Sequence, residues 1–320
     1  MQILITGGAG FIGSTLADKL LSEGYRILVI DNFNDYYDVR LKEANVAPNL
    51  NNKNYKLYRG DICDRELVEK IFKENNIEKV VHIAARAGVR PSLENPPEYI
   101  RSNIDGTINI LENMKKYNVK KMVFASSSSV YGNCSAEKFS EDLKVTEPIS
   151  PYAATKSACE QFLYTYSKLY DIKTVCLRFF TVYGPKQRPD LAIRKFIELI
   201  EKNEPIPVYG DGTTMRDYTF IDDIISGICA AIDYDKTPYE IINLGGGSPV
   251  TLNKMIETIE EVLGKKAQIN RLPMQPGDVN KTVSDITKAQ KLLGYNPKTS
   301  FKDGIEKFVN WRMKSKKCWI

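Results

Sequence analysis

Short runs of apolar, mostly β-branched residues alternate along the first half of the chain with longer segments of helical periodicity. Strands that alternate with helices must pair in parallel through right-handed crossovers, so the pattern predicts an α/β fold built on a doubly wound sheet. The predicted strands are residues 2–6, 26–30, 55–59, 79–83, 121–125 and 173–178, and the predicted helices are residues 14–23, 66–75, 99–117 and 153–169.

The regular alternation stops after residue 180. Clusters of glycine and proline at 183–189 and 205–212 are typical of loops. A helix at 222–232 and a strand at 241–244 are predicted to return the chain to the sheet. Two amphipathic helices, at 252–263 and 301–314, then predict a smaller C-terminal lobe.

Composition and charge narrow the classes of partner. Lysine and arginine number 45 and aspartate and glutamate 40, a net charge of +5 that is spread along the chain. We therefore expect no nucleic-acid partner and no membrane-surface partner. No apolar run approaches the roughly 20 residues of a membrane span. The first residues already have the pattern of a strand, so no signal peptide is expected.

Cysteine and histidine usage excludes further chemistry. The six cysteines form no CxxC pair and are irregularly spaced, which indicates free thiols, mostly buried, in a cytoplasmic protein rather than a disulfide framework or zinc site. His82 is the only histidine and lies within an apolar strand pattern, so a core position is favoured over a catalytic one. Its isolation excludes Ser-His-Asp, Cys-His and multi-histidine metal sites, and no metal is expected.

A glycine-rich turn follows the first predicted strand. Gly7, Gly10 and Gly13 stand before an amphipathic helix, the context that a dinucleotide-binding loop requires. Glycine permits the tight turn and the close approach of the pyrophosphate, whose charge is favoured at a helix N-terminus. A glycine turn that binds nothing is the weaker alternative. The fold is thus predicted to be a Rossmann-type doubly wound parallel sheet with a smaller C-terminal substrate-binding lobe.

Acidic residues end the second and third strands. Asp31 lies 18 residues after Gly13, where a carboxylate accepts the adenosine ribose hydroxyls and repels a 2′-phosphate, which favours NAD over NADP. Asp61 is suited either to the adenine amino group or to capping the strand end. The NAD-binding domain is predicted to comprise residues 1–180, with return segments near 217–247. The lobe is predicted to comprise residues 181–216 and 248–320.

A Tyr-x-x-x-Lys motif supplies candidate acid–base chemistry. Tyr152 and Lys156 are four residues apart, which places both on one face of a helix. A neighbouring ammonium group and a cationic nicotinamide favour the phenolate, making Tyr152 a general base. The serine run 126–129 ends the fifth strand, where a hydroxyl such as that of Ser127 can bond the reacting oxygen, although a polar loop is the alternative.

Together the glycine loop, Asp31, Ala84-Ala85, the serine run, Tyr-x-x-x-Lys and Arg178-Phe179-Phe180 resemble the extended short-chain dehydrogenase/reductase family, specifically its nucleotide-sugar epimerases. The resemblance covers nearly the whole chain. It implies NAD as cofactor and a UDP-sugar as substrate. The implied catalytic residues are Ser127, Tyr152 and Lys156. The implied cofactor-binding residues are Gly7, Gly10, Phe11, Ile12, Gly13, Asp31, Asn32, Asp61, Ile62, Ala84, Ala85, Tyr152 and Lys156.

The resemblance also implies a reaction. Tyr152 would take the 4-hydroxyl proton while the C4 hydride passes to NAD, and the 4-keto sugar would turn and regain the hydride on its other face. The related 4,6-dehydratases and UDP-glucuronate decarboxylases carry acidic residues where this chain has Ser128 and Ser129, which disfavours those reactions. A net NAD-dependent oxidoreductase and a non-catalytic NAD-binding regulator also stay open.

Substrate contacts follow from the same resemblance. Arg216 would hold the diphosphate, Tyr209 would stack on uracil and Asp278 would hold the uridine ribose, whereas Gln275 stands where many relatives have arginine. A polar and partly cationic set would receive the carboxylate of UDP-glucuronate, the favoured sugar. Thr282 is small enough for an N-acetyl group, so UDP-N-acetylglucosamine and UDP-glucose stay open. The carboxylate set is Ser127, Ser128, Thr181 and Arg188.

A homodimer is implied by the resemblance alone. The family pairs the helices that correspond to residues 99–117 and 153–169 into a four-helix bundle. A monomer is the alternative that the sequence leaves open.

Overall fold

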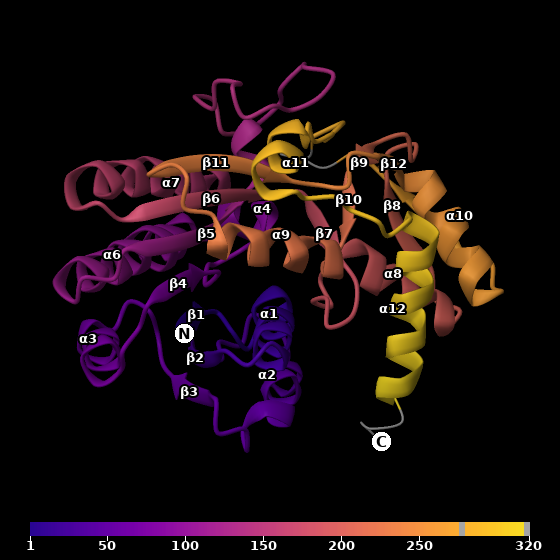
Figure 1. Ribbon diagram of the computed structural model, residues 1–320. Helices are drawn as coiled ribbons and strands as arrows, with labels where there is room; N and C mark the ends of the chain where they lie inside the picture. Colours follow the sequence, from indigo (N-terminus) through magenta and orange to yellow (C-terminus); the bar gives the residue numbers. More distant parts are fainter. Residues whose placement is uncertain (275–278, 317–320) are drawn as a thin grey trace.

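The computed structural model describes residues 1–274 and 279–316, and its centre is a seven-stranded parallel sheet in the order β11-β6-β5-β4-β1-β2-β3 (Figure 1). This is the predicted doubly wound fold. The strand order reverses between β1 and β4, and such a switch point opens a crevice at the carboxyl ends of the strands. The strands are β1 (Gln2–Thr6), β2 (Arg26–Asp31), β3 (Tyr55–Arg59), β4 (Lys79–His82), β5 (Lys121–Ser127), β6 (Lys173–Phe179) and β11 (Tyr239–Leu244).

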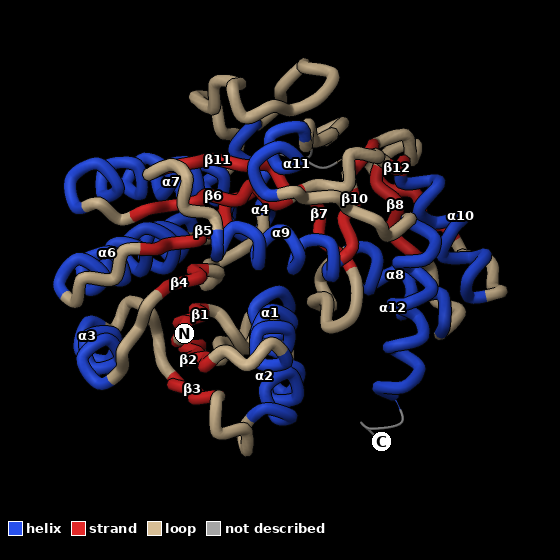
Figure 2. Tube along the Cα trace, in the orientation of Figure 1, coloured by secondary structure: helices blue, strands red, loops and turns tan. Residues whose placement is uncertain are grey.

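Helices cover both faces of the sheet, which explains why its strands are apolar almost throughout. Successive residues of a strand point to opposite faces. Ile3 and Ile5 pack in one cluster with helices α1 and α9, whereas Leu4 packs in a second cluster with α3, α6 and α7. Figure 2 shows the two helical layers. The helices are α1 (Phe11–Ser22), α2 (Val39–Val46), α3 (Arg65–Glu74), α6 (Gly106–Lys116), α7 (Pro151–Tyr170) and α9 (Ile221–Asp233).

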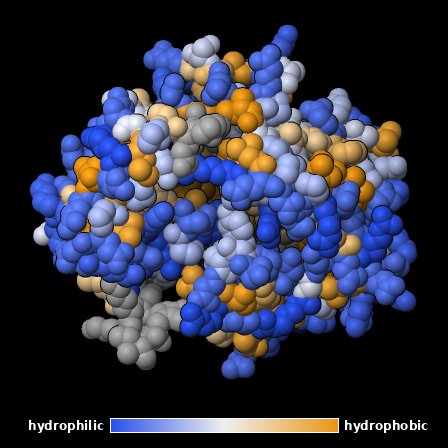
Figure 3. Space-filling model, turned by 180° about the vertical axis from the view of Figure 1, so that it is seen from behind, coloured by the Kyte–Doolittle hydropathy of each residue, from blue (hydrophilic) through white to orange (hydrophobic). Residues whose placement is uncertain are grey.

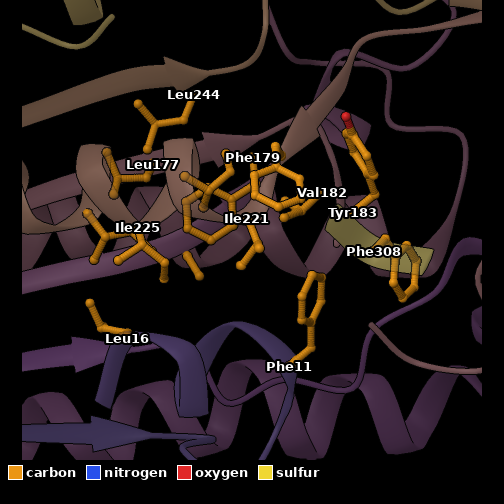
Figure 4. Packing of buried hydrophobic residues seen from close by; sticks show 14 of the residues in the cluster. Phe11, Leu16, Leu177, Phe179, Val182, Tyr183, Ile221, Ile225, Leu244 and Phe308 are labelled. Carbon is orange, nitrogen blue, oxygen red and sulfur yellow. The ribbon is translucent and has the colours of Figure 1, made fainter. Parts of the chain in front are cut away.

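The first cluster continues from the sheet into the C-terminal part of the chain. Figure 4 shows Leu16 of α1 and Ile225 of α9 beneath Leu177 of β6, with Phe308 farther along the same apolar layer. The proposed division into domain and lobe remains a prediction, since one core spans both. The elements of this part are β7 (Thr181–Tyr183), α8 (Ala192–Glu201), β8 (Ile206–Tyr209), β9 (Met215–Arg216), β10 (Tyr218–Phe220), β12 (Val250–Thr251), α10 (Leu252–Leu263), β13 (Ile269–Leu272), α11 (Thr287–Leu293) and α12 (Phe301–Lys316).

The helix predicted at 99–117 is wrong as a single element. The structure has α5 (Pro96–Tyr99), a π-helical turn η2 (Ile100–Asp105) and then α6. Two prolines start α5, and the wider π turn accommodates Asn103, whose side chain bonds the backbone of Arg86 instead of facing solvent. Periodicity does not distinguish a π turn from an α turn. The short helices α2 and α4 (Val89–Glu94) were not predicted.

The surface in Figure 3 is mostly hydrophilic, with apolar groups in separate patches. Within residues 1–274 and 279–316, no helix combines the length and the apolar character needed to cross a membrane. The same part of the chain gathers no set of three or more histidine, cysteine or acidic side chains that could hold a metal ion.

A buried ion pair connects helix α7 with strand β6 of the sheet. The guanidinium of Arg178 on β6 donates to both carboxylate oxygens of Glu160, at 2.9 and 2.7 Å, and the two side chains are 1% and 0% exposed. The hydroxyl of Ser126 donates to the same carboxylate at 2.5 Å. A bidentate, fully enclosed pair of this kind fixes an orientation as well as a distance.

We expect Glu160→Gln to lower the free energy of unfolding by about 3 to 5 kcal/mol, because it leaves the buried Arg178 charge uncompensated. Chemical denaturation measures the change. Glu257→Gln is the matched control, since Glu257 pairs with Lys254 at the surface, where both side chains are about two-thirds exposed, and little change is expected there. Equal stability of Glu160→Gln and the unaltered protein would contradict the prediction.

Candidate active site

A pocket runs along the carboxyl edge of the sheet, across the switch point between β1 and β4. Its walls are the glycine loop after β1, the ends of β2 to β6 and the first turns of α7. All thirteen residues predicted to bind the cofactor line this one pocket. The structure therefore brings them together, while their contacts with a ligand remain predictions.

The glycine loop has the geometry that the sequence predicts. Gly7 has a φ of +72°, and a Cβ there would lie 2.8 Å from backbone atoms of Ala84. A Cβ on Gly13 would lie 2.2 Å from the carbonyl oxygen of Gly7. Helix α1 begins at Phe11 without a side-chain cap, so its first N–H groups are available to an anion. The loop fits a pyrophosphate.

The two carboxylates at the strand ends are held by the backbone. Asp31, 8% exposed, accepts hydrogen bonds from the Ala9 and Phe33 amides, at 3.0 and 2.9 Å. Asp61, two residues beyond the end of β3, accepts from the Cys63 amide at 2.8 Å and also lines the pocket, and its contact with adenine stays a prediction. Burial would raise the pKa of Asp61, but the bond from the Cys63 amide and others from Cys63, Asn32 and Arg101 keep that pKa below its ordinary value.

Helix α7 presents the predicted catalytic pair to the far end of the pocket. The helix begins at Pro151, and the Ser150 hydroxyl caps it by accepting from the Ala153 amide at 3.2 Å. Tyr152 and Lys156 then lie one turn apart, and the Lys156 ammonium donates to the Ala125 carbonyl at 2.7 Å. The strand predicted at 121–125 extends to Ser127, which puts the Ser127 hydroxyl at the strand end beside Tyr152.

Burial and a guanidinium act in opposite directions on Tyr152. Burial raises the pKa of the phenol, and the hydrogen bond with Ser127 and the positive charge of Arg188 lower it, with a net shift upward. Burial lowers the pKa of Lys156 to about 8. The sequence predicted that Lys156 and a cationic nicotinamide favour the phenolate. The structure adds Arg188, whose charge acts on Tyr152 and which Asp190 holds through two hydrogen bonds of 3.1 and 3.0 Å.

A second pocket adjoins the first, and Thr181 lines both. Among the residues described in its lining, five carry hydroxyl groups, one is an arginine and none carries a carboxylate. These six are Ser128, Ser129, Ser150, Thr181, Thr282 and Arg216. The pocket can thus donate several hydrogen bonds and a positive charge to a polar, anionic ligand.

The predicted substrate residues are not all in one place. Ser128, Thr181, Arg216 and Thr282 line the second pocket, whereas Ser127 and Arg188 line the first. Tyr209 ends β8 and lies in neither lining, with the Arg90 guanidinium 5.0 Å from its ring centre. The predicted contacts of Gln275 and Asp278 lie outside the described residues.

Sequence reasoning missed several residues that line the first pocket. The guanidinium groups of Arg86 and Arg188 both lie over the ring of Tyr36, at 5.2 and 5.3 Å from its centre. Lys42, 4% exposed, donates to the Asn34 carbonyl at 2.9 Å. Asn34, Tyr36, Tyr37 and Arg86 stand in loops and Lys42 in the short helix α2, and no periodic pattern identifies any of them. The missed lining residues are Asn34, Tyr36, Tyr37, Lys42 and Arg86.

The prediction that His82 is a core residue is confirmed. It is 0% exposed, and hydroxyl oxygens lie against both ring nitrogens. Burial, together with the charge of Lys156, lowers its pKa to about 3, so the ring is neutral.

The sequence of the chain is similar to those of known proteins. Residues 4–308 match the family model described as GDP-mannose 4,6 dehydratase. The chain is 48% identical to the UDP-glucuronate 4-epimerase of Thermodesulfobacterium geofontis, over 96% of this chain and 95% of that protein.

Solved structures of UDP-sugar 4-epimerases are also similar to this chain. The crystal structure of UDP-glucuronic acid 4-epimerase from Bacillus cereus in complex with UDP-glucuronic acid and NAD has a TM-score of 0.93 and 38% identity, covering 98% of this chain and 100% of that one. A UDP-N-acetylglucosamine 4-epimerase from Methanobrevibacter ruminantium in complex with UDP-N-acetylmuramic acid has a TM-score of 0.88 and 31% identity, covering 98% of each chain. At these sequence identities the chain is similar to these proteins in family as well as in fold.

We expect Arg188→Gln to raise the pKa of Tyr152, because it removes the cation that favours the phenolate. The phenolate would then form only at higher pH. Tyrosinate absorbance during a pH titration reports this, taken as the difference between each protein and the same protein carrying Tyr152→Phe. Arg40→Gln, which removes an exposed guanidinium paired with Asp38, should leave the titration unchanged. A Tyr152 titration unaltered by Arg188→Gln would refute the assignment.

Proposed function

The chain belongs to the extended short-chain dehydrogenase/reductase family, in its group of UDP-sugar 4-epimerases, and from that premise we propose that it inverts C4 of UDP-glucuronate with bound NAD. The product of that inversion is UDP-galacturonate. The Bacillus cereus relative, which is 38% identical, binds both UDP-glucuronic acid and NAD. The enzyme is accordingly an isomerase, since substrate and product differ only at one stereocentre.

One observation carries the proposal. Ser127, Tyr152 and Lys156 stand at the end of the dinucleotide pocket that adjoins the hydroxyl-lined second pocket, with Thr181 shared between them. A sugar held in the second pocket would therefore meet an acid–base group and a dinucleotide at one position. C4 chemistry requires that arrangement.

The residues present fit NAD. The glycine loop and the uncapped start of α1 would hold the pyrophosphate, Asp31 would accept the adenosine ribose hydroxyls, and Lys156 would hold the nicotinamide ribose. Bound NAD supplies an acceptor for the C4 hydride and returns that hydride later in the same turnover. The sugar is thus oxidised and then reduced at one carbon, with no net redox change.

The protein supplies proton transfer and orientation. Tyr152 takes the proton of the 4-hydroxyl as C4 is oxidised to a ketone, and Ser127 donates a hydrogen bond to that oxygen. The ketone turns in the pocket, and Tyr152 returns the proton once the hydride has been restored on the opposite face. Burial raises the pKa of Tyr152, and the hydrogen bond with Ser127 and the charge of Arg188 oppose that rise.

The second pocket favours epimerisation over the dehydratase and decarboxylase reactions. Those reactions need a carboxyl group near C5, and the described lining has Ser128 and Ser129 where the relatives place one. The hydroxyls and arginines at this end suit the carboxylate of glucuronate. Arg188, beside Tyr152 in the first pocket, and Arg216, in the second, supply the positive charge.

We expect purified protein without added cofactor to convert UDP-glucuronate to UDP-galacturonate, because a 4-epimerase regenerates its NAD in each turnover. NMR of the sugar products measures the conversion. Parallel incubations with UDP-glucose and UDP-N-acetylglucosamine define the sugar specificity. Absence of any C4 inversion, with NADH forming only after NAD is supplied, would identify a net oxidoreductase instead.

Tyr152→Phe should lower turnover by about 10² to 10⁴-fold, because the ring remains but the proton acceptor is lost. The NAD content of the purified variant, measured by absorbance after denaturation, should stay at the level of the unaltered protein. Full turnover in this variant would remove Tyr152 from the reaction. The matched control is Tyr164→Phe, which alters an exposed tyrosine of the same helix and should retain full turnover.

We also propose that the protein is a homodimer paired through α7 and the α5–η2–α6 segment. These helices pack side by side, at the left of Figure 1. They leave large apolar side chains in solvent, with Ile100 50%, Phe162 38% and Leu169 65% exposed. A second copy of the same face would bury these side chains.

Phe162→Glu combined with Leu169→Glu should shift the protein to a monomer, because like charges would face one another in the pairing. Sedimentation velocity distinguishes the two states. The control is Ile269→Glu, which places a charge at a comparably exposed isoleucine of β13 and should leave the dimer intact. A monomer before any substitution would disprove the pairing.

A cytoplasmic location completes the proposal. Five cysteines lie in the described residues, and all are free thiols. Thiols persist in reducing compartments, whereas disulfides form in oxidising ones. The cytoplasmic location is therefore proposed from the five free cysteines, which are Cys63, Cys134, Cys159, Cys176 and Cys229.

A further inference from the structure

A row of buried polar side chains lies behind the wall of the dinucleotide pocket, next to Ala84 and Lys156, and has no part in the mechanism above. It joins Thr6 at the end of β1, His82 at the end of β4 and Thr107 in α6. The three side chains are 0%, 0% and 1% exposed. Thr6 Oγ1 lies 2.6 Å from His82 Nδ1, and Thr107 Oγ1 lies 2.9 Å from His82 Nε2.

The hydrogen bonds of this row are consistent with one donor-to-acceptor order, from Thr6 through His82 to Thr107. The Ala84 amide donates to Thr6 Oγ1 at 3.1 Å, and the Ile83 amide divides its donation between Thr6 Oγ1, at 3.1 Å, and the Thr6 carbonyl, at 3.2 Å. With two amides directed at its oxygen, the Thr6 hydroxyl is best satisfied as a donor. Its proton must therefore go to His82 Nδ1. His82 then carries its proton on Nε2 and donates to Thr107 Oγ1, and the Thr107 hydroxyl donates to the Asn103 carbonyl at 2.5 Å.

The row ends at a residue that joins the pocket to the catalytic helix. The Asn103 side chain accepts from the Arg86 amide at 2.7 Å and donates to the Arg86 carbonyl at 3.1 Å. It also donates to the Thr155 hydroxyl of α7 at 2.9 Å. Thr155 stands between Tyr152 and Lys156, and residues 84–87 line the dinucleotide pocket. One chain of bonds thus spans the glycine strand, the pocket loop and the catalytic helix.

We propose that His82 is a positioning residue. As the neutral Nε2–H tautomer it fixes the position of loop 84–87 relative to helix α7. It thereby sets the distance between the nicotinamide end of the pocket and Tyr152. The proposal rests on the proposed function only in requiring a dinucleotide in this pocket. Burial and the positive charge of Lys156 both disfavour an imidazolium. The Cys159 thiol also contacts the row, at 3.6 Å from Thr107 Oγ1.

The tautomer can be tested directly, because the chain contains one histidine. A long-range ¹H–¹⁵N correlation spectrum of tag-free, ¹⁵N-labelled protein should show a single ring protonated on Nε2. The ring should not titrate between about pH 8 and about pH 5, a range across which an ordinary histidine gains its proton. A ring protonated on Nδ1, or one that titrates in this range, would overturn the proposal.

The variant Thr107→Val distinguishes a positioning role from a folding role, because it keeps the side-chain shape but removes the hydroxyl and its bonds to His82, the Asn103 carbonyl and the Cys159 thiol. We expect kcat to fall by about tenfold to a hundredfold, with a lower NAD content on purification. The KM for UDP-glucuronate should change little, because the second pocket does not touch this row. Thr107→Ser keeps the hydroxyl and should recover most of kcat.

The matched control is Thr258→Val. Thr258 is also buried, in helix α10, and its hydroxyl also donates to the carbonyl four residues earlier, at 2.8 Å. It should lose stability as Thr107→Val does, but keep kcat and NAD content. Equal kcat and NAD content in both valine variants would overturn the proposal. If no epimerisation occurs in any protein while NAD content still falls in Thr107→Val alone, the proposed function fails and the positioning role stands.

Discussion

The site depends on one constraint, the attachment of helix α7 to the end of strand β5. Three consecutive residues at the end of β5 each form a hydrogen bond with a different residue of the helix. The first uses its backbone carbonyl, and the second and third use their side-chain hydroxyls. The buried Arg178 guanidinium holds the helix from the adjacent strand. Sliding the helix by one turn would break all of these contacts together, so the spacing of phenol, ammonium and serine is fixed. The pairs are Ala125 with Lys156, Ser126 with Glu160, and Ser127 with Tyr152.

The rest of the chemistry follows from where this attachment lies. It stands at the carboxyl edge of the sheet, beside the crevice that the strand reversal between β1 and β4 opens. The same edge carries the glycine loop and Asp31, so a dinucleotide that fits them reaches Tyr152 at its far end. Thr181 then connects this pocket to the hydroxyl-lined one. Dinucleotide, base and sugar can therefore meet at one position.

The polar groups that shape this site are buried, and their energetics differ from those of surface residues. Glu160 accepts from two nitrogens of the Arg178 guanidinium, and His82 is neutral because both burial and Lys156 oppose its charge. Burial also lowers the pKa of Lys156 to about 8 and raises that of Tyr152. Each of these groups acts through a partner from another element, so the site is rigid where proton transfer needs a fixed distance.

The sequence by itself determined the strands, the glycine loop, Asp31 and the Tyr152–Lys156 pair. All of these depend on short-range rules: alternation within a strand, the backbone freedom of glycine, and the i, i+4 spacing of a helix. It also placed His82 in the core, because its neighbours are apolar. These inferences needed no knowledge of which distant segments would meet.

Only the tertiary structure decided the contacts between segments far apart in the chain. Arg188 lies 36 positions from Tyr152 and no pattern links them, yet its charge acts on the phenol. The π turn at Asn103, the position of two arginines over the Tyr36 ring and the second pocket likewise arise from packing. Burial and through-space charge set the pKa values, and both are properties of the folded chain rather than of local sequence.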